Sequence, residues 1–343
     1  MEFRSPESAL RSLGHAFNLS RTLLPRMRDQ DFSNGARAQH HRENCQELLS
    51  DTQLLLKGLE SCQLEELPLT TRSRMRRELP PVISALQELA ATDSIFRIQA
   101  EETAMTLSGA LTTFRETDSA LFAPLRQQLR VGTLRGVSLS SLLEKNLNDR
   151  RFLDGYSGAD VMLDELLELE EPPDRMTEGH LLKEGMIHYQ PLWVGELLSI
   201  GSNLKLSPED TFCDLGAGVG RPGMLLSLLT GCRAISVEYQ TPLAEIGKRA
   251  IERNKLDCVE MINGDVRDFD FQRANVFYMF NPFHGKLFSH VGRMLAARIE
   301  TARTHGEQIR VCGVANGPFL SLVPGLVLVK SDGITQYFES IQP

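Results

Sequence analysis

Short apolar segments alternate with helical patterns from residue 211 to the end of the chain. Five of these segments are Thr211 to Asp214, Ala234 to Glu238, Val259 to Ile262, Val276 to Phe280, and Ile309 to Val314. Such alternation is typical of a parallel sheet covered by helices on both faces. Two further segments, Leu326 to Lys330 and Ile334 to Phe338, flank a Ser-Asp-Gly turn and indicate an antiparallel hairpin. We therefore expect an α/β fold, a Rossmann-like doubly wound sheet with a C-terminal antiparallel hairpin.

The first half of the chain has a different pattern, in which apolar residues recur at helical spacing. The run from Leu48 to Leu59 is one example. Pro172 and Pro173 follow a run of carboxylates and are typical of a linker, because proline neither continues a helix nor joins a sheet interior. We expect an all-α helical domain over residues 1–171, for substrate recognition or as a lid, and the α/β domain over residues 177–343.

The composition narrows the class of partner. The formal net charge of −8 disfavours a protein that coats nucleic acid. No apolar run approaches the ~20 residues needed to span a bilayer, and the amino terminus lacks the apolar core of a secretory signal. We expect a cytoplasmic protein without membrane contact, and a nuclear location stays open if the source is eukaryotic. The six cysteines are scattered, so no metal site is expected, and the arginines from Arg72 to Arg77 are interpreted as a solvated helix face.

A glycine-rich loop follows the first strand of the α/β domain. Residues 214–221 read Asp-Leu-Gly-Ala-Gly-Val-Gly-Arg, and glycines let a backbone turn sharply and approach a ligand. Dinucleotide enzymes use G-x-G-x-x-G at this place, but here Arg221 stands where the last glycine of that motif would fall. Asp214 is poorly placed beside a pyrophosphate and well placed near the ammonium end of S-adenosylmethionine. The loop therefore favours S-adenosylmethionine as the cofactor.

The ends of the next two strands extend this prediction. Glu238 ends the second strand, where a carboxylate can accept both ribose hydroxyls. After the third strand, Asp265 can accept a hydrogen bond from the adenine amino group, and the amide of Val266 can donate to a ring nitrogen. The predicted cofactor-binding residues are Asp214, Gly216, Ala217, Gly218, Gly220, Glu238, Asp265 and Val266.

The fourth strand leads into the turn Asn281-Pro282-Phe283, at the edge of the sheet where the transferable methyl group should lie. Many amine methyltransferases carry Asn or Asp, two prolines and an aromatic residue there, with carbonyls that hold the target nitrogen. This chain has one proline, so the match is partial and favours a nitrogen acceptor. The alternative is a structural turn closed by a buried Phe283.

The stretch from Tyr189 to about Val291 resembles the histone lysine methyltransferases that lack a SET domain, the disruptor-of-telomeric-silencing type, and their bacterial look-alikes. The similar residues are Asp214 to Gly216, Gly218 to Gly220, Thr230, Cys232, Val237, Glu238, Pro242, Gly264, Asp265 and the turn from Asn281 to Phe283. The resemblance implies that Tyr189 is a cofactor or channel residue. The chain departs from that family at Pro282, where the family has asparagine, and at Pro191, where it has an acidic residue.

Taken together, these patterns predict an S-adenosylmethionine-dependent methyltransferase whose catalytic residues are Asn281, Tyr189 and Phe283. Asn281 would orient the acceptor, and Tyr189, Phe283 and Trp193 would wall an apolar channel. Two acceptors stay open: a lysine-type amine of a protein recognised by the helical half, or a small molecule beneath the helical half as a lid. A third hypothesis, a scaffold protein with a degenerate site, is disfavoured by the intact Asp214 and Glu238.

Overall fold

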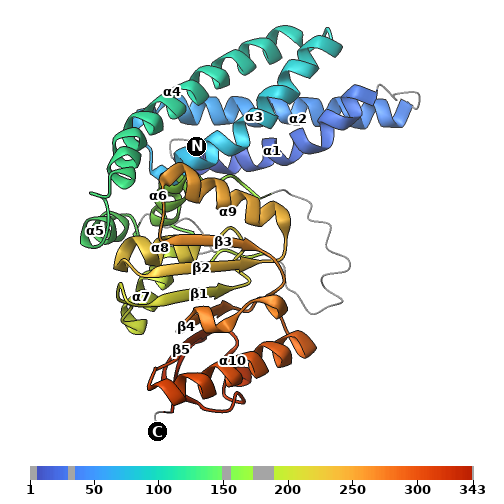
Figure 1. Cartoon of the computed structure of the whole chain (residues 1–343). Helices are drawn as coiled ribbons and strands as arrows, with labels where there is room; N and C mark the ends of the chain where they lie inside the picture. The colour runs from blue at the N-terminus through green and yellow to red at the C-terminus, as the bar shows by residue number, and fades with distance from the viewer. Residues whose placement is uncertain (1–5, 30–34, 149–155, 173–188, 342–343) are drawn as a thin grey trace. The chain divides into compact units, whose positions relative to one another are not determined.

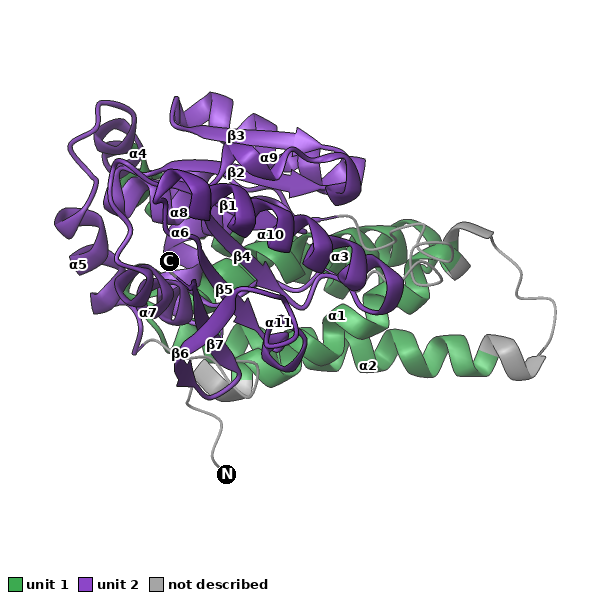
Figure 2. Cartoon of the chain, turned by 60° about the horizontal axis from the view of Figure 1, so that its bottom comes forward, with its two compact units in different colours: residues 1–123 green, residues 124–343 purple. Residues whose placement is uncertain are grey.

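The computed structural model describes residues 6–29, 35–148, 156–172 and 189–341. The chain divides into two compact units, which comprise residues 1–123 and 124–343 (Figure 2).

The first unit is built from long helices, as the sequence predicts (Figure 1). Its helices are α1 (Pro6–Asp29), α2 (Gly35–Glu60), η1 (Leu64–Glu66), α3 (Leu69–Thr92) and the first part of α4 (Arg97–Arg130). Leucines from α1, α2 and α3 fill one apolar core, in which Leu13, Leu48 and Leu79 are fully buried. Burial of such a stripe, rather than helix propensity alone, is what stabilises helices of this kind.

A buried ion pair joins α3 to α4 inside this unit. Arg72 donates from Nε to Asp118 at 2.7 Å, and Arg76 reaches the other carboxylate oxygen at 2.9 Å. Arg72 and Asp118 are both buried. The interpretation of this arginine cluster as a solvated face is therefore wrong for Arg72, because a carboxylate 46 residues away in the sequence holds it in the core.

The second unit contains a seven-stranded sheet in the order β3-β2-β1-β4-β5-β7-β6. The strands are β1 (Thr211–Leu215), β2 (Arg233–Glu238), β3 (Val259–Asn263), β4 (Val276–Phe280), β5 (Arg310–Val314), β6 (Leu326–Asp332) and β7 (Thr335–Ser340). The first five are parallel, while β7 runs antiparallel to both β5 and β6. The predicted doubly wound sheet and terminal hairpin are confirmed.

Helices cover both faces of this sheet (Figure 1). They are α5 (Val137–Lys145), α6 (Gly158–Leu167), α7 (Val194–Leu204), α8 (Arg221–Thr230), α9 (Thr241–Asn254), α10 (Gly285–His305) and α11 (Gly317–Leu320), with 3₁₀ turns η3 (Val266–Asp268) and η4 (Phe271–Arg273). Gly223 of α8 packs on Ala234 and Ser236, whereas α10 shares a core with Ile235 and Val237. Because successive side chains of a strand point to opposite faces, α8 and α10 lie on opposite sides of the sheet.

Helices α5 and α6 precede the sheet in the sequence but belong to the same compact unit. Helix α5 packs on α8, and α6 packs on α7 and α9. Within this unit Arg126 forms an ion pair with Glu165. The contacts place the division at residues 123 and 124, whereas the sequence suggests a domain border between 171 and 177, and that border stays a prediction.

Among the helices of the described residues, none combines the length and the apolar character that a membrane crossing requires.

Candidate active site

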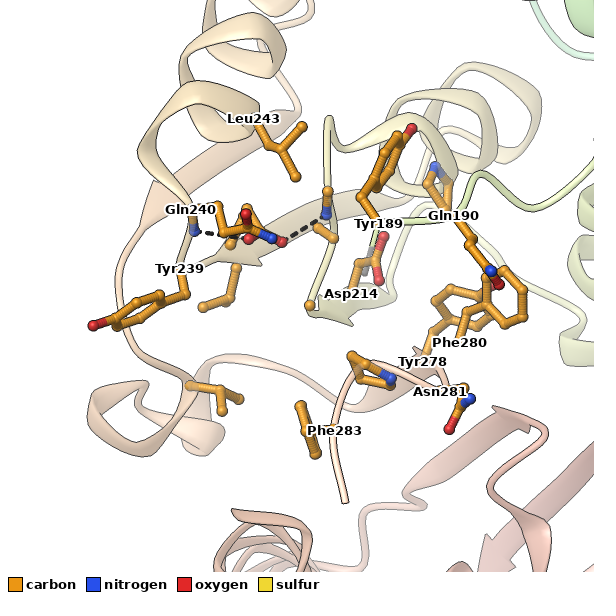
Figure 3. Close-up of a pocket in the computed structure, with 18 of the residues that line it drawn as sticks. Tyr189, Gln190, Asp214, Tyr239, Gln240, Leu243, Tyr278, Phe280, Asn281 and Phe283 are labelled. Atoms are coloured by element: carbon orange, nitrogen blue, oxygen red, sulfur yellow. Dashed lines mark hydrogen bonds between the residues drawn. The ribbon is translucent and has the colours of Figure 1, made fainter. Parts of the chain in front are cut away.

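A pocket opens at the carboxyl edge of β1, β2 and β4 (Figure 3). It holds about 950 Å³ of empty space, including the part that is open to solvent. The predicted site residues that line it are Tyr189, Asp214, Gly216, Ala217, Gly218, Glu238, Val266, Asn281 and Phe283. Ligands of doubly wound sheets bind at this edge, where the loops after the parallel strands converge.

The glycine loop after β1 is in close contact with two other segments that line the pocket. Gly216 has φ +84° and Gly218 has φ +57°, conformations that glycine adopts without the steric cost that a Cβ brings. A Cβ atom on Gly216 would lie 2.3 Å from Cβ of Pro282, and one on Gly218 would lie 2.2 Å from Cε2 of Tyr189. The glycines therefore allow the loop to meet both the β4 turn and the Tyr189 segment.

Glu238 connects this loop to the end of β2. One carboxylate oxygen accepts the Gly218 amide at 2.8 Å, and the other accepts the Gln240 amide at 2.7 Å (Figure 3). Burial raises the pKa of Glu238, and the backbone hydrogen bonds oppose that shift. Each carboxylate oxygen has a second lone pair, so the side chain can still accept hydrogen bonds from hydroxyl groups of a ligand.

Asp214 is the last residue but one of β1, and only 2% of its surface is exposed. Its Oδ2 atom has no hydrogen-bond partner in the part of the chain that the structure describes. Burial raises the pKa of Asp214 well above the usual range, and the neighbouring Glu238 adds to the shift. A buried carboxylate without a partner is costly, so this position is suited to a cationic ligand group.

The turn after β4 is fixed by the end of β5. The Asn281 amide donates to the carbonyl of Val314 at 3.1 Å and to the side-chain oxygen of Asn316 at 2.7 Å. Asn281 has φ +40°, a left-handed conformation that asparagine tolerates better than most residues. Phe283 is buried and packs on Phe288 with ring centroids 6.1 Å apart. Hydrogen bonds to the end of β5 and packing on Phe288 thus hold the turn, all three residues of which line the pocket.

Arg221 is a structural residue of the site that the sequence did not reveal. It is buried at the start of α8 and donates to Asp160 of α6 at 2.9 Å and to the carbonyl of Leu192 at 2.9 Å. Asp164 lies 2.8 Å from its Nε. Asp160 also accepts the amide of Val194 at 2.9 Å. This cluster, Arg221 with Asp160 and Asp164, fixes the segment from Leu192 to Val194, which follows Tyr189.

Three predicted residues do not line the pocket. Gly220 has φ +78° and caps α8, which is a backbone role. The Asp265 carboxylate accepts the Arg267 amide at 2.8 Å and forms an ion pair with its guanidinium. Trp193 is 40% exposed at the start of α7 and is not a pocket residue. Two aromatic residues of β4, Tyr278 and Phe280, do line the pocket.

The fold and this site define the class of protein. Residues 188–278 match the family described as histone methylation protein DOT1. The α/β unit has the fold and the site of a class I S-adenosylmethionine-dependent methyltransferase, a class whose cofactor is S-adenosylmethionine. Over the matched residues it is similar to the DOT1 family, as the resemblance in the sequence implies.

Proteins of known activity are similar to parts of this chain. A histone-lysine N-methyltransferase of Dictyostelium discoideum, specific for H3 lysine 79, is 34% identical over 94 residues, which span 23% of this chain and 5% of that protein. An RNA methyltransferase from Salinibacter ruber, solved with S-adenosyl-L-homocysteine, is 17% identical and covers 45% of this chain and 94% of its own, with a TM-score of 0.35. An S-adenosylmethionine-dependent O-methyltransferase from Thermotoga maritima is 12% identical and covers 48% and 70%, with a TM-score of 0.36.

Proposed function

We propose that this methyltransferase transfers a methyl group from S-adenosylmethionine to an amine nitrogen of a lysine-type side chain in a protein. The observation that carries the proposal is the Asn281-Pro282-Phe283 turn, which lines the pocket next to the glycine loop. The similarity of residues 188–278 to the DOT1 family supports a lysine acceptor.

The polar groups of the pocket suit the parts of the cofactor. Asp214, a buried carboxylate whose Oδ2 lacks a partner among the described residues, would bind the ammonium group. Glu238 would accept the ribose hydroxyls, and Gly216, Ala217 and Gly218 would allow the backbone to approach the ligand. The Val266 amide and the Asp265 carboxylate would bind adenine, the latter once it turns from Arg267. When bound, S-adenosylmethionine supplies an electrophilic methyl group, so the protein needs no nucleophile of its own.

The remaining task of the protein is to prepare and align the acceptor. A free lysine amine has a pKa of about 10.4 and must lose its proton before it can attack. The apolar surfaces of Tyr189 and Phe283 would lower that pKa, because desolvation disfavours the charged form. Asn281 would orient the amine toward the methyl group, and this alignment accounts for a large part of catalysis in reactions of this type.

Incubation of the full chain with radiolabelled cofactor and a cell extract, followed by separation by size, tests the proposal. We expect label on a protein band and methyl-lysine in its digest. The matched control is Gly218→Val, whose side chain would collide with Tyr189 and which should leave the band unlabelled. Label on small solutes alone would contradict a protein acceptor. Absence of any transfer by a chain that still binds S-adenosylhomocysteine would contradict the methyl-transfer proposal itself.

A further inference from the structure

Tyr278 is a buried pocket residue to which the proposed function assigns no role. It lies on β4 with 1% of its surface exposed and stacks on Phe212, with ring centroids 5.7 Å apart. Its hydroxyl group has no hydrogen-bond partner within the described ranges of the chain, although buried hydroxyls in folded proteins nearly always have one. Because the same side chain lines the pocket, a ligand in the pocket is the natural partner for this hydroxyl.

The neighbour of Tyr278 indicates what that ligand group is. Tyr278 and Asp214 are register partners on the parallel strands β4 and β1, so their side chains lie on the same face of the sheet (Figure 3). Burial raises the pKa of Tyr278 well above its usual range, and the Asp214 carboxylate adds to that shift. The Tyr278 hydroxyl therefore keeps its proton, and its oxygen lone pairs can accept hydrogen bonds.

The charge at this place selects between the two ends of an amino acid. The negative charges of the Asp214 and Glu196 carboxylates both raise the pKa of the Tyr278 hydroxyl. A ligand carboxylate beside this hydroxyl would therefore meet like charge. An ammonium group would meet opposite charge, and it carries three N–H donors, enough for the Tyr278 hydroxyl oxygen and the Asp214 carboxylate together.

We propose that Tyr278 is a further cofactor-binding residue, whose hydroxyl oxygen shares with Asp214 the α-ammonium group at the amino-acid end of S-adenosylmethionine. This inference rests on the proposed role of Asp214 in cofactor binding. It predicts that Tyr278 selects ligands by their amino group and not by their nucleoside.

Calorimetric titration of the full chain and of Tyr278→Phe with three ligands tests this assignment. S-Adenosylhomocysteine carries the whole amino-acid end, its decarboxylated analogue keeps only the amino group, and methylthioadenosine has neither. We expect the variant to bind the first two about tenfold more weakly, a loss within the range for one hydrogen bond to a charged group. Its affinity for methylthioadenosine should not change.

Tyr337→Phe is the matched control, because Tyr337 is a buried tyrosine of β7 outside the pocket lining, and it accepts a hydrogen bond from Asn203 at 3.1 Å. This variant should bind all three ligands as the parent does. Equal weakening of all three ligands in Tyr278→Phe would mean a structural role and overturn the proposal, as would unchanged affinities. A loss confined to S-adenosylhomocysteine would assign the hydroxyl to the carboxylate and also overturn it. Failure of the parent chain to bind S-adenosylhomocysteine would instead overturn the proposed function.

Discussion

Gly218 and Tyr189 are in such close contact that a Cβ atom at position 218 would lie 2.2 Å from Cε2 of the tyrosine ring. The glycine also has φ +57°, a conformation that L side chains rarely adopt. The contact joins the loop after β1 to the segment that precedes α7, and both line the pocket. The contact therefore makes the shape of the cofactor site depend on a residue 29 positions upstream of Gly218.

The first prediction follows from this contact. Gly218→Ala should weaken S-adenosylhomocysteine binding by about tenfold or more, because the loop or the ring must move and the positive φ becomes strained, a cost of order 1–3 kcal/mol. Calorimetry measures the loss. Addition of Tyr189→Ala should recover part of it by removing the clash. Gly292→Ala is the control, because a Cβ there would make an ordinary contact of 3.5 Å with Val323. An unchanged affinity in Gly218→Ala would contradict the prediction.

The second prediction concerns Asp214 and pH. Since burial raises its pKa in the folded chain, the folded state holds this proton more tightly than the unfolded state does. The resulting loss of stability is absent below the ordinary carboxyl pKa and grows as the pH rises toward the raised value. Asp214→Asn should therefore raise the free energy of unfolding of the ligand-free chain at pH 8 by roughly 1–3 kcal/mol, and with it the unfolding temperature. The gain should be smaller at lower pH.

The same variant should bind S-adenosylhomocysteine more weakly, because it lacks the charge that faces the ammonium group. Thermal melts from pH 5 to pH 8, with and without ligand, separate the two effects. A variant that is less stable than the parent at pH 8 would show that the buried Asp214 carboxylate does not lower the stability of the ligand-free chain.

The third prediction concerns the buried cluster of Arg221, Asp160 and Asp164. Arg221→Met should lower the free energy of unfolding by about 3–5 kcal/mol, because it leaves the buried Asp160 and the partly exposed Asp164 without their cation. Chemical denaturation measures this loss. Arg249→Met is the control, since the ion pair of Arg249 with Glu170 is exposed and exposed pairs contribute little. Equal denaturation midpoints for the two variants would be incompatible with the cluster.

The fourth prediction concerns Asn316, which positions the β4 turn. It is buried, and its side-chain oxygen accepts the Asn281 amide at 2.7 Å. Asn316→Ala should lower kcat by about ten- to a hundredfold, because small displacements of an aligning group are costly. The affinity for S-adenosylhomocysteine should stay the same. Asn316→Asp keeps the acceptor oxygen and should retain most of the activity. If both variants lose cofactor affinity together, Asn316 supports the pocket as a whole and not the turn.

The parts of the fold that follow from local patterns could be predicted from the sequence. The second strand ends at Glu238 as predicted, and the first ends at Leu215, one residue beyond the predicted Asp214, because apolar runs and glycines mark these ends directly and parallel strands end at one edge. The contacts of Arg221 could not be predicted, since Asp160 lies 61 residues away and only the packing of α6 brings it near. The burial of Arg72 could not be predicted for the same reason, since Asp118 lies 46 residues away. The sequence predicts Tyr278 only as part of a strand, because a sequence does not show that a hydroxyl lacks a partner.

The Arg221 cluster also determines where the α/β half can be separated from the rest. A fragment that begins at residue 177 would bring Arg221 into the interior while leaving both of its carboxylates behind on α6. It would also remove the oxygen that accepts the Val194 amide. We therefore expect that a fragment able to fold alone must start upstream of Gly158, so that it contains both aspartates as well as the arginine that they neutralise.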